Sequence, residues 1–75
     1  MLPAWQVLQR NGTLMVETPI GAKKASVRLM DAFGRELFRS EGNGVVGIPV
    51  GRSGIAFLAL EADGKREVRK INLIR

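Results

Sequence analysis

Hydrophobic and polar residues alternate in short runs along most of the chain, and turn residues separate the runs. In residues 25–31, for example, Ala, Val and Leu occupy every second position. A period of two places such side chains on one face of a β-strand, so the pattern predicts an all-β protein. The expected strands are residues 5–10, 13–18, 25–31, 35–39, 44–50, 55–62 and 65–74.

Residues that favour tight turns lie between the expected strands. Asn11-Gly12 and Asp63-Gly64 readily adopt the positive φ values of type I′ turns, so each dipeptide predicts a β-hairpin. Gly34 closes the stretch 31–34 and can take the left-handed conformation that another turn requires. About seven strands with turn signals every 8 to 12 residues or so are typical of a small Ig-like or fibronectin-like β-sandwich of antiparallel strands, which is the expected fold.

Three features place individual segments within this sandwich. Residues 55–62 are the most continuously apolar, which predicts a central strand covered on both faces, with Leu58 and Leu60 pointing inward. Pro49 has no backbone N–H to donate, so its strand is expected at a sheet edge. Trp5 is expected to cover the core and not to form a carbohydrate platform, because a domain this small needs its large side chains for packing.

The composition is that of one small globular domain, and we expect residues 1–75 to form it. Apolar residues make up 45% of the chain and charged residues 25%, which argues against disorder. No apolar run reaches transmembrane length, and the first twelve residues lack the basic and apolar regions of a signal peptide. Because strand-like sequence follows Met1 almost at once, we expect a domain excised from a larger parent protein.

The residue types limit the chemistry that the chain can perform. The sequence has no Cys, His or Tyr, so disulfides and thiolate metal sites are excluded and a zinc site is nearly excluded. The seven acidic residues are scattered singly through turns and strand ends, and no nucleophile has an evident partner. We therefore expect neither enzyme activity nor a cofactor.

Two short motifs match functional patterns in a context that does not support them. Residues 42–47 have the glycine spacing of a dinucleotide-binding loop, but β-branched residues and Pro49 follow where a helix is required. Asn11-Gly12-Thr13 matches the N-glycosylation sequon, but the same residues form the strongest turn signal in the chain. We interpret both motifs as turns.

The charge balance of twelve Lys and Arg against seven Asp and Glu gives a net charge of +5. This excess suggests an anionic partner such as nucleic acid, lipopolysaccharide or an acidic surface. In a strand, however, residues 65–70 divide their charges between two faces, and the few aromatic residues are not interleaved with them. The pattern disfavours a nucleic-acid interface and favours solvated charges that protect a sheet edge.

The order of short motifs along the chain carries a further signal. A strand ends in Asp31 and is followed by Gly34-Arg35, Ser53-Gly54-Ile55 opens the apolar strand, and Lys70-Ile71 lies in the last strand. In this order, from about residue 14 to the end, the sequence resembles the C-terminal sorting domain of type IX secretion in Bacteroidetes-like bacteria.

The resemblance implies a non-catalytic, folded address at the C-terminus of a larger exported protein. In this family the outer-membrane translocon recognises the domain, and a sortase-like peptidase commonly removes it. The covalently attached N-terminal cargo passes through the periplasm and is secreted or retained at the cell surface. The resemblance, together with the position of the motifs, points to a set of recognition residues. They are Gly34, Arg35, Gly54, Lys70, Ile71, Leu73 and Ile74.

Two departures from the family pattern and one alternative function are also visible in the sequence. The common Asn-Pro opening of the family is absent, and the Asn11-Gly12 hairpin replaces it. The family usually has an aromatic residue two positions after the glycine of the apolar strand, where this chain has Ala56 followed by Phe57. The alternative function is a structural or carbohydrate-contacting accessory module of a secreted enzyme. A sugar-binding module should display several exposed aromatic residues on one face, and Trp5 is the only candidate here.

Overall fold

The computed structural model describes residues 4–75, which form seven β-strands and no helix. Residues 1–3, although part of the expected domain, lie outside the described residues. The strands are β1 (Gln6–Arg10), β2 (Thr13–Glu17), β3 (Ala25–Asp31), β4 (Glu36–Glu41), β5 (Val45–Pro49), β6 (Gly54–Ala62) and β7 (Lys65–Leu73). The prediction of an all-β protein is confirmed.

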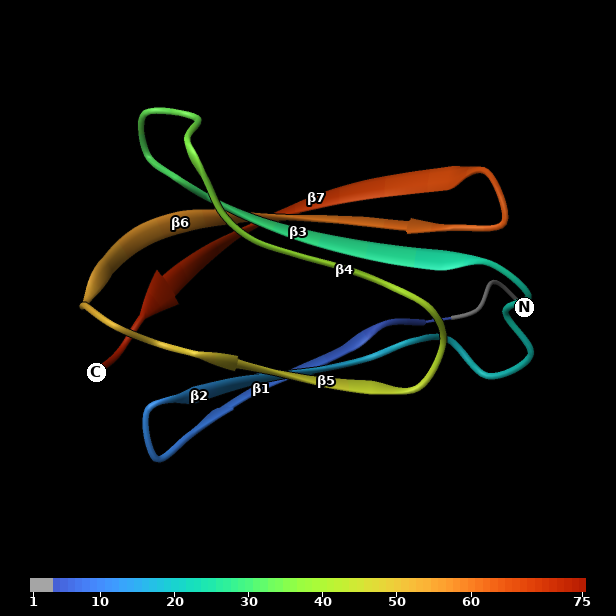
Figure 1. The fold of residues 1–75 in the computed structure, drawn as a ribbon, viewed down its shortest axis with the longest axis horizontal. Coiled ribbons are helices and arrows are strands. Elements are labelled where there is room, and N and C mark those ends of the chain that lie inside the picture. The colour runs from blue at the N-terminus through green and yellow to red at the C-terminus, as the bar shows by residue number, and fades with distance from the viewer. Residues whose placement is uncertain (1–3) are drawn as a thin grey trace.

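The strands form two antiparallel sheets that face each other as the layers of a small sandwich (Figure 1). One sheet has the order β1-β2-β5, and the other has the order β4-β3-β6-β7. Hairpins join β1 to β2, β3 to β4 and β6 to β7, so the chain passes between the sheets only before β3, before β5 and before β6. The predicted β-sandwich is therefore confirmed.

Both predicted hairpin turns have the backbone conformation that their dipeptides favour. The φ angles are +50° at Asn11 and +74° at Gly12, and +50° at Asp63 and +83° at Gly64. Positive φ at both central residues characterises a type I′ turn, whose twist matches that of the strands it joins. The sequon and the turn therefore coincide at residues 11–13.

Alternating residues of facing strands form the core between the sheets. In β6, Leu58 and Leu60 are fully buried, as predicted, and Trp5 is only 7% exposed. The other buried apolar side chains of this core are Leu14, Val16, Ala25, Val27, Leu29, Ile48, Val50, Ala56 and Leu73. Because these residues alternate with exposed or half-buried ones along most strands, a change of register would expose the core face.

The outer face of β6 differs from the prediction. This strand is central in its sheet, between β3 and β7, but the second sheet covers only its inner face. On the outer face, Ile55 is 43% exposed. Ala59 is nonetheless buried, because its short side chain lies between its ladder neighbours Arg28 and Val68. The expectation that both faces of β6 are covered is therefore wrong.

The edge strands β4 and β5 lie close to the positions predicted from the sequence. Pro49 lies at the end of β5, which is an edge strand, as its missing N–H predicted. The strand expected at residues 35–39 instead covers Glu36–Glu41, because Ser40 and Glu41 continue the ladder with β3. The connection between β4 and β5 therefore covers only residues 42–44.

Replacing Leu58 with Ala should lower the free energy of unfolding by about 2–5 kcal/mol, because removing this fully buried side chain leaves a cavity between the sheets. A domain of this length has a total stability of about 4–11 kcal/mol, so the loss should be large. Urea unfolding followed by the fluorescence of Trp5 measures the change.

The matched control is Val68→Ala on the neighbouring strand, where the side chain is 56% exposed. This substitution should change the stability by less than about 0.5 kcal/mol. If both variants lose the same stability, the inner face of β6 has been assigned wrongly.

Candidate functional site

Four of the seven residues predicted for recognition meet at one end of the sandwich. Gly34 and Arg35 lie in the turn between β3 and β4, Gly54 begins β6, and Leu73 ends β7 beside it in the ladder. The turn, the loop before β6 and Leu73 line a shallow hollow of about 180 Å³. We call the turn 31–35, the segment 52–55 and Leu73 together the Asp31 corner; it lies near the C-terminal end of the chain (Figure 1).

The other three predicted residues, Lys70, Ile71 and Ile74, do not share one surface with the corner. Lys70 is exposed on the outer face of β7, opposite Phe57. Ile71 faces inward and packs against the core, and Ile74 is 63% exposed beyond the end of the strand. The period of a strand explains this separation, because neighbouring residues point to opposite faces.

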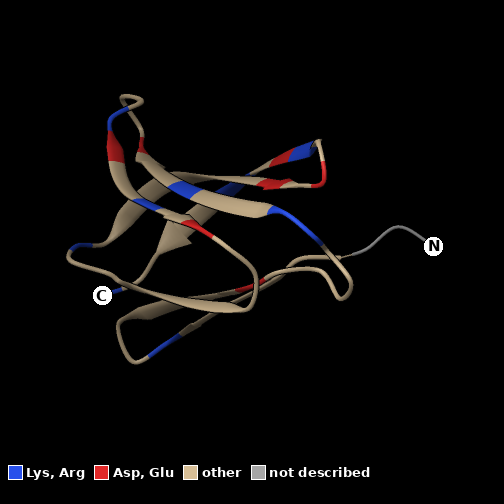
Figure 2. Cartoon of the chain, turned by 45° about the vertical axis from the view of Figure 1, so that its right-hand side comes forward, with Lys and Arg blue, Asp and Glu red and all other residues tan. Residues whose placement is uncertain are grey.

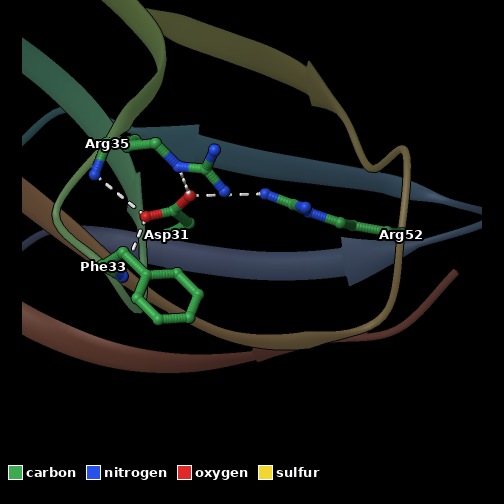
Figure 3. Close-up of polar contacts among 4 residues, drawn as sticks. All are labelled: Asp31, Phe33, Arg35 and Arg52. Atoms are coloured by element: carbon green, nitrogen blue, oxygen red, sulfur yellow. Dashed lines mark hydrogen bonds and ion pairs between the residues drawn. The ribbon is translucent and has the colours of Figure 1, made fainter.

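Asp31 organises the corner. Its side chain is only 7% exposed. Its Oδ1 atom accepts hydrogen bonds from the backbone N–H groups of Phe33 and Arg35, each at 2.9 Å, and its Oδ2 atom accepts one from Nε of Arg35 at 2.7 Å (Figure 3). The backbone N–H of Gly34 also donates to the carbonyl of Asp31 at 3.0 Å. Side chain and main chain together therefore fix the conformation of the turn.

A second arginine reaches the same carboxylate from a different loop. The Nη2 atom of Arg52, in the loop before β6, lies 3.5 Å from Oδ2 of Asp31 (Figure 3). The side chains of Arg35 and Arg52 are 69% and 58% exposed. Two guanidinium groups thus share one carboxylate, which leaves the cluster with one excess positive charge.

The environment of Asp31 keeps its carboxylate ionised. Burial alone would raise its pKa, because a charge is less stable away from water. The carboxylate accepts hydrogen bonds from the backbone and guanidinium of Arg35 and from the backbone of Phe33, and it lies beside the charge of Arg35. Together these interactions outweigh the effect of burial. The pKa therefore lies below its ordinary value of 3.8. The ion pairs of the corner persist at neutral pH.

Backbone conformation explains both glycines of the predicted set. Gly34 has a φ of +84° and Gly54 a φ of +139°, values that residues with a side chain rarely adopt. Apart from the glycine and its two chain neighbours, no heavy atom of residues 4–75 lies within 4 Å of the position that a Cβ atom would occupy at either residue. These glycines shape the corner through the turns they permit and not through close packing.

The departure from the family pattern at residues 56 and 57 has a structural consequence. Ala56 is fully buried between the sheets, whereas Phe57 lies on the opposite, outer face of β6. Phe57 therefore does not fill the inward position that an aromatic residue at position 56 would occupy.

Gln9 makes a contact that sequence reasoning missed. From β1, its Nε2 atom donates to the carbonyl of Asn72 at 2.7 Å, and its Oε1 atom accepts from the backbone N–H of Ile74 at 2.9 Å. The side-chain amide thus takes the main-chain positions that another strand would use at the end of β7. No local pattern marks this contact, because its partners are 63 and 65 residues away in sequence.

The rest of the outer edge of β7 has no strand beside it among residues 4–75. In a strand, backbone groups of alternate residues point to the same side. Gln9 binds the carbonyl of Asn72, which therefore points outward from the sheet. Because backbone direction alternates along the strand, the backbone groups of Arg66, Val68 and Lys70 also point outward. Two basic side chains along this edge agree with the expectation of charges that discourage edge-to-edge pairing.

A larger hollow, of about 650 Å³, lies beside the β6–β7 hairpin turn. Its lining includes lysines as well as acidic residues. The carboxylate of Asp63 there accepts hydrogen bonds from the backbone N–H groups of Lys23 and Lys24. These bonds lower the pKa of Asp63 and tie the hairpin to the loop before β3. The carboxylate therefore serves to connect two loops.

Basic residues are distributed over both sheets and the loops (Figure 2). Within residues 4–75, no group of three or more acidic side chains is placed to hold a metal ion, and no helix could cross a membrane. The sequence matches no protein-family model and no curated protein. The Asp31 corner and the end of β7, where residues predicted for recognition lie, are the candidate site.

Replacing Asp31 with Asn should destabilise the protein at neutral pH, because Asn keeps an acceptor for the turn but loses the charge that holds both arginines. Since the folded pKa is below 3.8, the stabilisation from the charge is fully present above about pH 4 and is lost as pH falls through the folded pKa. The difference in melting temperature between the original protein and the variant should therefore shrink between pH 5 and about pH 2.

Glu17→Gln, which removes an exposed carboxylate from β2, is the charge-matched control. It should alter the melting temperature little at either pH. If Asp31→Asn lowers the melting temperature by the same amount at pH 5 and at about pH 2, the ionised carboxylate does not have the stabilising role assigned to it.

Replacing Gln9 with Leu should remove both bonds to the end of β7 while keeping a side chain of similar size. The expected local loss is about 1 kcal/mol, which corresponds to roughly fivefold faster hydrogen exchange at the amide of Ile74. Gln6→Leu, on the exposed outer face of the same strand, is the control and should leave that amide unchanged. Equal exchange rates in both variants would show that Gln9 does not hold β7.

Proposed function

We propose that this domain is a non-catalytic sorting signal, which directs an attached N-terminal cargo protein across the outer membrane by the type IX system. The observation that carries the proposal is the meeting of separate sequence motifs at the Asp31 corner. Gly34-Arg35, Ser53-Gly54-Ile55 and the end of the last strand are distant in sequence but adjacent in the fold. A surface assembled from the motifs of the resemblance is what a recognition role requires.

The last strand offers a second means of recognition. Its outer edge from Arg66 to Lys70 is unpaired within the described chain, and main-chain pairing with a partner strand needs no catalytic group. Lys70 and Ile74 are exposed next to this edge. In the proposal, the outer-membrane translocon and a sortase-like peptidase are the partners, and the periplasm is the compartment where they meet the domain.

The fold buries Trp5, the one aromatic residue that the sequence offered to the carbohydrate-contacting alternative. Trp5 is buried, and Phe38 and Phe57 are half-buried, so Phe33 is the one aromatic side chain of the described residues that is well exposed. A flat sugar-binding surface built from several aromatic rings is therefore not supported.

The proposal is tested by fusing residues 1–75 behind an exported reporter in a bacterium with type IX machinery. The reporter should reach the cell surface or the medium, and deletion of residues 66–75 should abolish this export. The deletion also removes buried Leu73 from the core, so it disrupts folding as well as any signal. Point variants that keep the core intact are therefore needed.

The double variant Lys70→Ala and Ile74→Asn changes two exposed side chains and should reduce export several-fold, because it removes recognition contacts but not core packing. Val68→Ala, on the same strand, should leave export unchanged. A reporter trapped in the periplasm behind the intact domain would contradict the proposal. Export that persists without residues 66–75, with a folded cargo, would contradict it equally.

A further inference from the structure

An exposed aromatic ring stands beside the two arginines of the Asp31 corner. Phe33 is 86% exposed, and its ring centroid lies 5.8 Å from Cζ of Arg35. The backbone N–H of Phe33 is bonded to Asp31, so the turn fixes the main chain that carries the exposed ring. A large apolar side chain held outside the core of a small domain is available for contact with a partner.

The two arginines have donors to spare. A guanidinium group carries five N–H donors, and within residues 4–75 the side chains of Arg35 and Arg52 interact with one carboxylate alone, that of Asp31. Asp31 neutralises only one of the two charges. The remaining donors and the excess charge can bind one further anionic group. The planar geometry of a guanidinium group fits that of a carboxylate especially well.

The hollow next to the arginines is partly apolar. Leu37 and Ile55, each 43% exposed, line it together with the buried Leu73. Its volume of about 180 Å³ is large enough for a single aliphatic side chain but too small for a larger ligand. An occupant would therefore combine one negative charge with a short apolar group.

We propose that the Asp31 corner binds an acidic and apolar peptide segment of a partner protein. In this arrangement a carboxylate of the partner bridges Arg35 and Arg52, and the neighbouring apolar side chain enters the hollow beside Phe33. Charge complementarity favours a carboxylate over a phosphate group, since one carboxylate neutralises the single excess charge whereas a phosphate carries about −1.5 to −2. This inference deepens the proposed function and rests on it for taking the corner as a surface that faces a partner.

The test is a titration of the ¹⁵N-labelled 75-residue protein with a capped hexapeptide of alternating Leu and Asp, up to about 10 mM, a range that detects weak binding. The amide signals of Phe33, Arg35, Ile55 and Leu73 should shift and saturate. The same peptide with Asn in place of Asp should leave these signals unchanged, because it lacks the carboxylates.

Variants identify which side chains bind the peptide. Arg52→Gln should weaken binding about fivefold or more while keeping the hydrogen bonds between Asp31 and Arg35, and Phe33→Ala should also weaken it. The matched control is Arg66→Gln, which removes an equal charge from an exposed residue near the opposite end of β7. It should leave the affinity unchanged.

Several results would overturn the inference. The first is that the peptide shifts no amide signal. The second is that the Asn peptide binds as tightly as the Asp peptide, and the third is that Arg66→Gln weakens binding as much as Arg52→Gln does. The fourth is that inorganic phosphate shifts the same amide signals as the peptide and to the same extent. Shifts that depend on protein concentration without peptide would identify a second copy of the chain as the occupant and would also overturn it.

The titration contains no secretion machinery, so it is separate from the reporter experiment. If the peptide binds as expected but the reporter is not exported, the proposed function is wrong and the peptide site remains. If export depends on the last strand but the peptide does not bind, the proposed function remains and the site at the Asp31 corner is wrong.

Discussion

The fold depends on the burial of a single layer of side chains between two small sheets. Within residues 4–75, no strand of one sheet pairs with a strand of the other, so the sheets share no backbone ladder. The chain also has no disulfide that could join them. Fully buried Leu14 and Ile48 from one sheet face Leu58 and Leu60 from the other. In so small a domain, each of these side chains contributes a large share of the total stability.

Polar side chains supplement this core around its rim, where each joins segments that are distant in sequence. Gln9 connects the first strand to the end of the last, and Asp63 connects a hairpin turn to the loop before β3. Thr18 accepts the backbone N–H of Gly44. Asp31 binds Arg52 from the loop before β6 and orders its own turn. The same carboxylate that stabilises the rim therefore also positions the proposed binding residues.

The sequence predicts those parts of the structure that local physics determines. Alternation identifies β3 with its correct bounds, and the positive φ of Asn11 and Asp63 follows from the residues at the turns. The roles of Arg52 and Gln9 could not be predicted, because their partners lie 21 or more residues away and become neighbours only when the sheets pack. The order of motifs along the chain names Lys70 and Ile71 together, and the period of the strand places their side chains on opposite faces of β7.

The contact of Gln9 has a mechanical consequence. β1 and β7, the first and last strands, run in the same direction, while the two ends of the described chain lie at opposite ends of the sandwich (Figure 1). Tension applied between the chain ends would pull these strands in opposite directions. The two hydrogen bonds between the Gln9 side chain and the backbone of Asn72 and Ile74 lie between these strands and would be loaded in shear. A force applied at the start of the first strand would therefore be transmitted directly to the end of the last.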